Sequence, residues 1–144
     1  MEYTQVGTRS GATAAGLHND LGLIIFADPA GGAVAAMEHF VKATEIHPEF
    51  PNAHFNAAVS SAKAGDHDKA TVWFKQALDL APDNALYYHH YGASLMESKQ
   101  GLDKASGAFG HSVRLKGDDA ESYNLLGVVQ VCRALRQLYL LWHI

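Results

Sequence analysis

Apolar residues recur with a helical period in the middle of the chain. Within residues 67–82, four of them fall at the i, i+4, i+7, i+8 spacing of one helical face: Ala70, Phe74, Ala77 and Leu78. Asp66 or Asp68 can accept hydrogen bonds from the free amides that begin this helix, and Pro82 ends it. Residues 52–65 read as a partner helix that ends at a glycine. The pattern therefore predicts two helices joined by a short turn.

The same pair of helices recurs at a period of 34 or 35 residues. The matched positions are small or aromatic: Ala36, Ala70 and Ala105; Phe40, Phe74 and Phe109; Gly92 and Gly127; Pro48 and Pro82. Two helices can approach closely only where the facing side chains are small, and a phenylalanine then fills the adjacent groove. Each copy is therefore predicted to be one helical hairpin whose apolar face is covered by the next copy.

These hairpins resemble the tetratricopeptide repeat, a helix–turn–helix unit of 34 residues with a characteristic set of small and aromatic positions. Residues 51–84 carry the resemblance best, with His54, Ala57, Ala58, Ser61, Ala70, Phe74, Ala77 and Pro82. Residues 85–119 form a further copy, with one inserted residue near Gly101. Residues 120–132 open a partial copy. Residues 17–50 form a degenerate copy, whose turn is about two residues longer. Residues 21–27 alone would read as a buried strand, but the repeat register predicts a helix there.

The resemblance implies an all-α fold, a short right-handed α-solenoid of antiparallel helix hairpins. We expect the repeat domain to cover residues 12–132. A flexible lead-in of residues 1–11 would precede it, and an apolar helix or tail of residues 133–144 would follow it.

The resemblance also implies that the first helix of each pair lines a concave groove that holds a peptide or a partner's helix. The expected groove residues are Asn52, Phe55, Asn56, Val59 and Lys63 in the second copy, Leu86, His89, His90, Ala93 and Glu97 in the third, and Glu121, Asn124, Leu125 and Val128 in the last. Asn56 and Asn124 could hydrogen-bond the backbone of an extended ligand. The alternative is a solvated polar face without a ligand.

The co-chaperone subtype of the family is not matched. Its members hold the C-terminal carboxylate of a partner with lysines, an arginine and asparagines at set groove positions, and among these Asn56 alone matches. Phe55, Val59, Leu86 and His90 stand where basic or amide side chains are needed. Without those cations no charge-assisted pairing to a carboxylate is expected.

Composition narrows the possible chemistry. The net charge of −4 gives no electrostatic footprint for nucleic acid, and no apolar run approaches the roughly 20 residues of a membrane span. Nine histidines invite a search for a metal site, but the neighbours His89 and His90 point about 100° apart on a helix and cannot chelate one ion together. Cys132 lies among apolar residues, so a packed thiol is expected. We therefore expect no catalytic residue, cofactor or metal.

The location of the protein follows only in outline. The single cysteine cannot form an internal disulfide, so nothing points to an oxidising compartment. No secretory signal precedes the repeats. The alternative that the chain is a processed precursor of an organelle protein is left open. An intracellular site is expected, in the cytoplasm or on the soluble side of an organelle.

The last residues depart from the repeat pattern. A predicted helix continues towards Leu141 and carries a cluster of large apolar side chains: Leu138, Tyr139, Leu141, Trp142 and Ile144. These residues are expected to contact another protein, because an exposed apolar cluster marks an interface. The alternatives are that the tail folds back over the last hairpin, or that the sequence is a truncated or misread product.

The expected function is non-catalytic protein–protein interaction. The chain would act as a scaffold, an adaptor or a structural subunit of a multi-protein assembly, with other proteins or peptide segments as partners. The alternative is that it is the regulatory repeat portion of an enzyme such as a glycosyltransferase, whose catalytic domain lies outside this chain.

Overall fold

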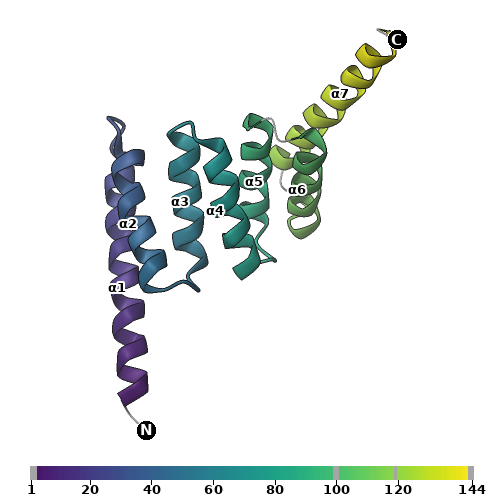
Figure 1. Ribbon diagram of the computed structural model, residues 1–144. Coiled ribbons are helices and arrows are strands. Elements are labelled where there is room, and N and C mark those ends of the chain that lie inside the picture. Colours follow the sequence, from purple (N-terminus) through teal and green to yellow (C-terminus); the bar gives the residue numbers. More distant parts are fainter. Residues whose placement is uncertain (1–2, 99–100, 119, 143–144) are drawn as a thin grey trace. The chain divides into compact units, whose positions relative to one another are not determined.

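The computed structural model describes residues 3–98, 101–118 and 120–142, with side chains from Thr13 onwards. All regular secondary structure within these residues is helical (Figure 1). The helices are α1 (Tyr3–Phe26), α2 (Gly32–Ile46), α3 (Pro51–Lys63), α4 (His67–Leu80), α5 (Ala85–Glu97), α6 (Leu102–Leu115) and α7 (Ala120–Trp142). The predicted all-α helical repeat is confirmed.

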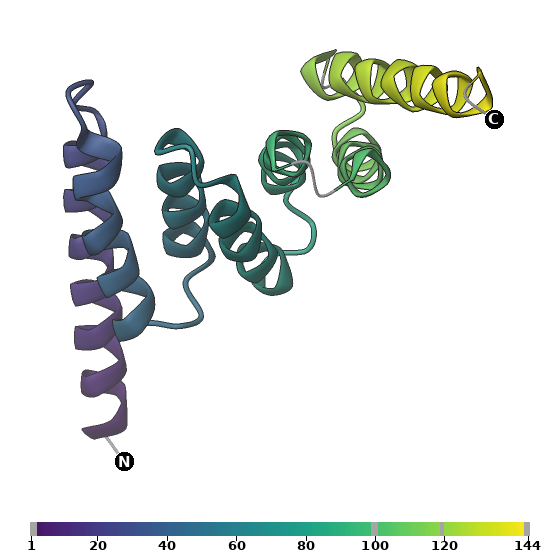
Figure 2. The same ribbon diagram turned by 45° about the horizontal axis from the view of Figure 1, so that its top comes forward.

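The helices form two compact units, residues 1–81 and residues 82–144. In the first unit, α1 packs against α2, α2 against α3, and α3 against α4. In the second unit, α5 packs against α6, and α6 against α7. Figure 2 shows the helices of each hairpin lying beside each other. The boundary between the units falls at Pro82, close to the predicted border between the second and third copies.

Helix boundaries follow from local chemistry. The Asp66 carboxylate accepts a hydrogen bond of 3.0 Å from the Lys69 amide and so caps the start of α4. Asn84 caps α5 in the same way. Gly65 has φ of +86° in the turn between α3 and α4, a conformation that glycine adopts without steric cost. The predicted choice between Asp66 and Asp68 is therefore settled in favour of Asp66.

Helix α1 differs from the sequence-based expectation at its start. Residues 3–11 were expected to form a flexible lead-in, but they are helical and continue α1. No proline occurs before Pro29 to interrupt the helix, and extending an existing helix is far easier than nucleating a new one. The strand-like residues 21–26 belong to the same helix, as the repeat register predicts.

A phenylalanine packs against a glycine in two of the hairpins. A Cβ atom added to Gly22 would lie 2.6 Å from the ring of Phe40, and one added to Gly92 would lie 2.8 Å from the ring of Phe109. The exposed fraction of Phe40 is 1% and that of Phe109 is 0%. The two helices of each of these hairpins therefore approach so closely that only glycine, whose side chain is a hydrogen atom, fits at the contact.

The extra residues of the first and third copies lie in turns. Relative to the second copy, two more residues separate Gly22 from Phe40, and one more separates Gly92 from Phe109. Gly31 and Gly101, which precede α2 and α6, have φ of +123° and +133°. The turns therefore absorb the added residues, and the glycine–phenylalanine contact is kept.

The close contact in the third copy generates the first prediction. Gly92→Ala should lower the free energy of unfolding by about 1–2 kcal/mol, because the new methyl group meets the buried Phe109 ring. The matched control is Gly107→Ala, on the exposed side of α6 with no atom within 4 Å of the added Cβ. The control should raise stability by about 0.5–1 kcal/mol. Urea denaturation measures both, and equal effects from the two changes would contradict the packing.

The buried alanines generate the second prediction. Ala70 and Ala105 are both 0% exposed, on α4 and α6. Ala70→Leu and Ala105→Leu should each destabilise by roughly 1–3 kcal/mol, because these sites have no room for three further carbons. Thermal denaturation monitored by circular dichroism measures the loss. Unchanged transition midpoints would mean that the helices can move apart at these positions.

Candidate binding surfaces

The first helices of the hairpins carry the predicted groove residues, which lie on α3, α5 and α7. In the first unit, α3 also contacts α1 directly. The Asn56 side-chain amide donates a hydrogen bond of 2.7 Å to the side-chain oxygen of Asn19. Nearer the C-terminal ends of the two helices, the Lys63 ammonium lies 4.4 Å from the ring centroid of Phe26. Two of the predicted groove residues thus join α3 to α1, while they keep part of their surface accessible.

The other predicted residues of α3 differ in exposure. Phe55 is half-buried, and its ring centroid lies 5.7 Å from that of the buried Phe74. Val59 is half-buried, and Asn52 is exposed. Asn19 was not predicted. The turn after α1 is two residues longer than in the second copy, so the 34-residue spacing does not align α1 with α3.

The second unit contains a small cup of about 260 Å³ between α5 and the start of α7. Its lining consists of Leu86, His89, His90, Lys116 and Glu121. Four of the five were predicted groove residues. Lys116 was not, because it is the C-cap residue of α6 and the predicted groove positions lie on the first helix of each pair.

His89 is held in a chain of buried hydrogen bonds. Its Nδ1 atom lies 2.7 Å from the hydroxyl of Ser122, which donates to the Ser112 hydroxyl at 3.0 Å. Ser112 in turn donates to the carbonyl of Ala85 at 2.9 Å. Because the Ser122 proton is already used, the network assigns the His89 proton to Nδ1, which donates to Ser122.

The other ring nitrogen of His89, Nε2, lies 3.8 Å from a carboxylate oxygen of Glu121. Serine, histidine and glutamate therefore stand in the order of a hydrolase triad. Ser122, however, is 0% exposed and His89 is 8% exposed. A nucleophile must reach its substrate, so this cluster joins α5, α6 and α7 rather than catalysing a reaction.

The neighbouring His90 is less buried than His89, and its pKa is lowered. Burial is the largest cause, the adjacent His89 adds to it, and the negative charge of Glu121 opposes it. His90 is therefore neutral at pH 7. Among the described residues that line the cup, the fixed charges are then one cation, Lys116, and one anion, Glu121, so these residues give no excess positive charge.

Several other predicted groove residues and the described tail residues face solvent, whereas Ala93 and Leu125 are half-buried and pack against the core of the second unit. Leu86 is 55% exposed and Val128 is 48% exposed, while Glu97 and Asn124 are exposed as well. In the tail, Leu138, Tyr139, Leu141 and Trp142 are 62%, 62%, 71% and 88% exposed, and Ile144 lies outside the described residues. The described tail residues therefore do not fold back over the last hairpin. Their contact with another protein stays a prediction.

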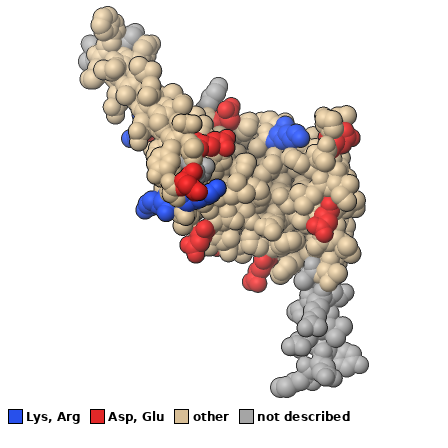
Figure 3. All heavy atoms as spheres, turned by 180° about the vertical axis from the view of Figure 1, so that it is seen from behind, with Lys and Arg blue, Asp and Glu red and all other residues tan. Residues whose placement is uncertain are grey.

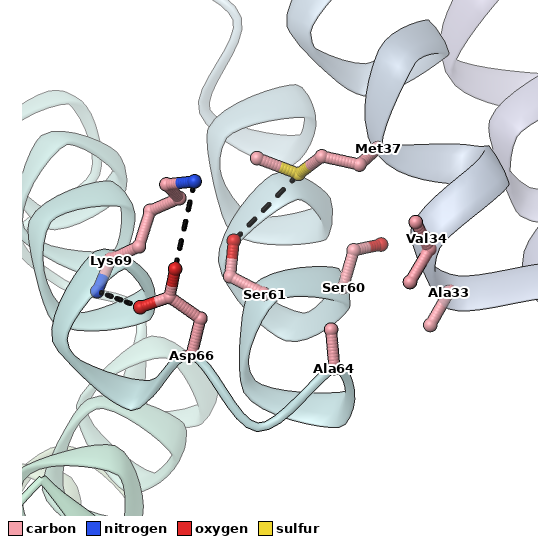
Figure 4. A pocket seen from close by; sticks show the side chains of 8 residues that line it. All are labelled: Ala33, Val34, Met37, Ser60, Ser61, Ala64, Asp66 and Lys69. Carbon is pink, nitrogen blue, oxygen red and sulfur yellow. Dashed lines mark hydrogen bonds and ion pairs between the residues drawn. The ribbon is translucent and has the colours of Figure 1, made fainter.

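A separate pocket of about 170 Å³ lies in the first unit, between α2, α3 and the start of α4 (Figure 4). Ser60 is 1% exposed there, and its hydroxyl has no hydrogen-bond partner among the described residues. The ion pair of Lys69 with Asp66, at 3.6 Å, borders the pocket. Ala33, Val34, Met37 and Ala64 make most of the remaining wall apolar.

Metal centres and membrane spans are two further kinds of feature that helices can form. In the part of the chain that the structure describes, no three histidine, cysteine or acidic residues are grouped so that they could hold a metal ion. His18 and His39 form a pair, with 3.3 Å between their Nδ1 atoms. Over the same residues, every helix is too short or too polar to cross a bilayer.

Comparison with known proteins identifies the repeat. The family model for the tetratricopeptide repeat matches residues 51–84. The protein O-mannosyl-transferase Tmtc2 of Drosophila melanogaster is 38% identical over 61 residues, which are 42% of this chain and 6% of that protein. The mitochondrial import receptor subunit TOM70 of Rattus norvegicus is 26% identical over 99 residues, which are 69% of this chain and 16% of the receptor. The chain therefore spans a small part of the curated relatives it matches.

Solved structures share the fold. The first repeat domain of Spaghetti (RPAP3), bound to the HSP90 peptide SRMEEVD, superposes with a TM-score of 0.80 at 19% identity, covering 85% of this chain and 95% of that one. The repeat domain of Sgt2 from Aspergillus fumigatus gives a TM-score of 0.74 at 16% identity, covering 87% and 81%. Residues 51–84 therefore form a tetratricopeptide repeat, and the chain shares the all-α helical-repeat fold of these solved repeat domains.

Proposed function

We propose that the chain is a non-catalytic protein–protein interaction module, which serves as a scaffold, an adaptor or a subunit of a larger assembly. The observation that carries this proposal is the chemistry of the first-helix faces. In the first unit, α3 carries the half-buried amide of Asn56. In the second unit, α5 carries the half-buried imidazole of His90 and the exposed side chain of Leu86. Amide and imidazole groups can pair with the main chain of a peptide, and apolar side chains can cover its apolar side chains. The similarly folded domain of RPAP3 holds a peptide in its structure.

The amide pair of the first unit suits main-chain recognition. One N–H of Asn56 is donated to Asn19, which fixes the orientation of the amide before a ligand arrives. The remaining amide atoms can meet one donor and one acceptor of an extended peptide. Because the contacts are to main-chain groups, ligands should share a backbone shape more than a sequence.

The cup of the second unit disfavours a free carboxylate as the bound group. Of the described residues that line it, Lys116 is the single cation, and Glu121 lies in the same lining. His90 is neutral at pH 7, because its pKa is lowered. We therefore propose internal peptide segments as partners rather than chain ends held by charge.

A second candidate is the regulatory repeat portion of a larger enzyme. The observation that favours it is the 38% identity to a segment of an O-mannosyl-transferase. A full-length transcript read from the native source distinguishes the two. A catalytic domain in frame with these repeats would support this candidate, and its absence would leave the interaction module.

The third prediction tests the first-helix faces. The combined variant Asn56→Ala, Leu86→Ala and His90→Ala should lose most of the partner protein captured from a native extract, because it removes both the polar and the apolar contacts. Its circular dichroism should stay that of the unchanged protein, since none of the three side chains is fully buried.

The matched control carries substitutions on the outer side of α4, where Val72 is 59% exposed and Lys75 is exposed. The variant Val72→Ala with Lys75→Ala should capture the same partners as the unchanged protein. If the control loses them and the first-helix variant keeps them, the binding surface lies on the second helices instead.

The fourth prediction concerns the titration of His90. Glu121→Gln should lower the pKa of His90 further below its ordinary value of 6.5, because it removes the charge that opposes the lowering. Nuclear magnetic resonance titration of the imidazole protons measures this. The stability contributed by neutral His90 should be complete above pH 6.5 and decline as pH falls through that value, since the unfolded chain then binds the proton first. A pKa of His90 at or above 6.5 would contradict the burial.

A further inference from the structure

The pocket of the first unit combines apolar walls with one unpaired polar group. Its volume is about 170 Å³, and its apolar lining comes from Ala33, Val34, Met37 and Ala64. Ser60 also lines it, is 1% exposed, and has a hydroxyl without a hydrogen-bond partner among the described residues. Figure 4 shows this hydroxyl pointing from α3 towards the α2 wall of Ala33 and Val34. A buried hydroxyl without a partner is costly, so the pocket favours an occupant that can pair with it.

The neighbouring serine has partners within the fold. The Ser61 hydroxyl donates to the carbonyl of Ala57, one helical turn earlier, at 3.0 Å. The same oxygen lies 3.7 Å from the Met37 sulfur. The Ser60 hydroxyl, by contrast, can still donate one hydrogen bond and accept others. The occupant of the pocket therefore needs one polar atom that can pair with a hydroxyl.

We propose that this pocket holds the phenol ring of a tyrosine, which a partner protein inserts between α2, α3 and the start of α4. The lining residues differ from the predicted groove residues of the first unit, which are Asn52, Phe55, Asn56, Val59 and Lys63. The pocket and the groove can therefore be tested separately.

The volume of the pocket indicates a single side chain. Pockets that enclose a whole small-molecule ligand have about 300–1,000 Å³, and this pocket is smaller. A cavity of about 150 Å³ is sufficient for benzene, so one six-membered ring fits. Val34 is 67% exposed and Ala64 is exposed, so the pocket opens to solvent at these residues. A ring on the surface of another protein can therefore enter from outside.

The chemistry of the lining indicates a tyrosine rather than another side chain. Met37 brings a thioether to the pocket, and its sulfur packs favourably against aromatic rings. A tyrosine fixes two side-chain torsions when it is inserted, so it loses less entropy than a longer flexible side chain. Its phenol oxygen can pair with the Ser60 hydroxyl. A phenylalanine would fill the same volume but would leave that hydroxyl unpaired.

The charges at the rim indicate a neutral ring. Among the described residues that line the pocket, Lys69 and Asp66 are the charged ones, and they pair with each other at 3.6 Å. The rim therefore has no net charge that would attract an ion. On the face that Figure 3 shows, the described acidic and basic side chains form small separate groups among uncharged surface. A phosphorylated tyrosine would bring about two negative charges close to Asp66, so we expect the pocket to accept the unmodified ring alone.

Nuclear magnetic resonance titration of the full chain with two ring probes tests the site. The probes are p-cresol, which matches the side chain of tyrosine, and toluene, which matches that of phenylalanine. The amide signals of Ala33, Met37 and Ser60 should shift and saturate with p-cresol, with a dissociation constant in the millimolar range expected for so small a ligand. Signals of these three residues that do not respond to p-cresol would overturn the proposal.

The variant Ser60→Ala tests the role of the hydroxyl. It leaves no side-chain polar group unpaired at this position, so it should fold as the unchanged protein does. The dissociation constant of p-cresol divided by that of toluene should rise about 2- to 10-fold, because one hydrogen bond is lost. The matched control is Ser94→Ala, the same change at a buried serine outside the pocket, which should leave this ratio unchanged. Equal ratios in Ser60→Ala and the unchanged protein would show that the hydroxyl does not recognise the ring.

Two tyrosine derivatives test the source and the charge of the ring. N-acetyltyrosinamide carries the ring on a peptide main chain and should shift the same signals as p-cresol. Its phosphorylated form should shift none of them. Binding of p-cresol without binding of N-acetyltyrosinamide would replace the partner's side chain by a free phenol and so overturn the proposal. Equal binding of the phosphorylated form would contradict the neutral rim.

Discussion

The contact between a small residue on the first helix and a phenylalanine on the second is the constraint on which the rest of this structure depends. At Gly22 and Gly92, the ring of the paired phenylalanine occupies the space that a Cβ atom would need. The contact survives two insertions, because the extra residues enter the turns at Gly31 and Gly101 instead of the helices. The chain therefore conserves a packing distance within each hairpin, and it allows the number of residues per repeat to vary.

That contact also decides which side chains remain for binding. Once one side of a first helix is pressed against its phenylalanine, the residues on its other sides either meet a neighbouring helix or face solvent. Asn56 and His89 meet a neighbour, through Asn19 and Ser122 respectively. Leu86 and Asn124 face solvent. The buried polar links fix the first helices in place, and a rigid, pre-arranged surface loses less entropy when it binds a ligand.

The period of the sequence predicts the helices, their pairing and the identity of most packed positions, because small and aromatic residues recur where helices cross. The helical continuation of α7 departs from that period, and the absence of glycine and proline after Gln130 predicts it instead. The period does not predict Asn19, because the longer first turn shifts α1 out of register. Nor does it predict Lys116, which reaches the cup from a helix C-cap and not from a first-helix position. The chain of His89, Ser122 and Ser112 joins three helices, and the direction of a hydroxyl depends on partners that a repeat pattern does not specify.

Helix α7 shows how a repeat array creates an uncovered surface. In the first unit, α3 packs on α2, on α4 and on α1, so several of its sides are covered. Within the described residues of the second unit, α7 packs on α6, chiefly through its first half, with Val129 completely buried. Beyond Arg133 the helix extends past most of its own contacts, and its apolar side chains, which lie on most sides, stay exposed. Apolar side chains that are exposed on most sides of a helix stabilise that helix only when another surface covers them. The free energy of burying exposed side chains such as Leu135, Leu138 and Trp142 is therefore not used in the folding of the second unit.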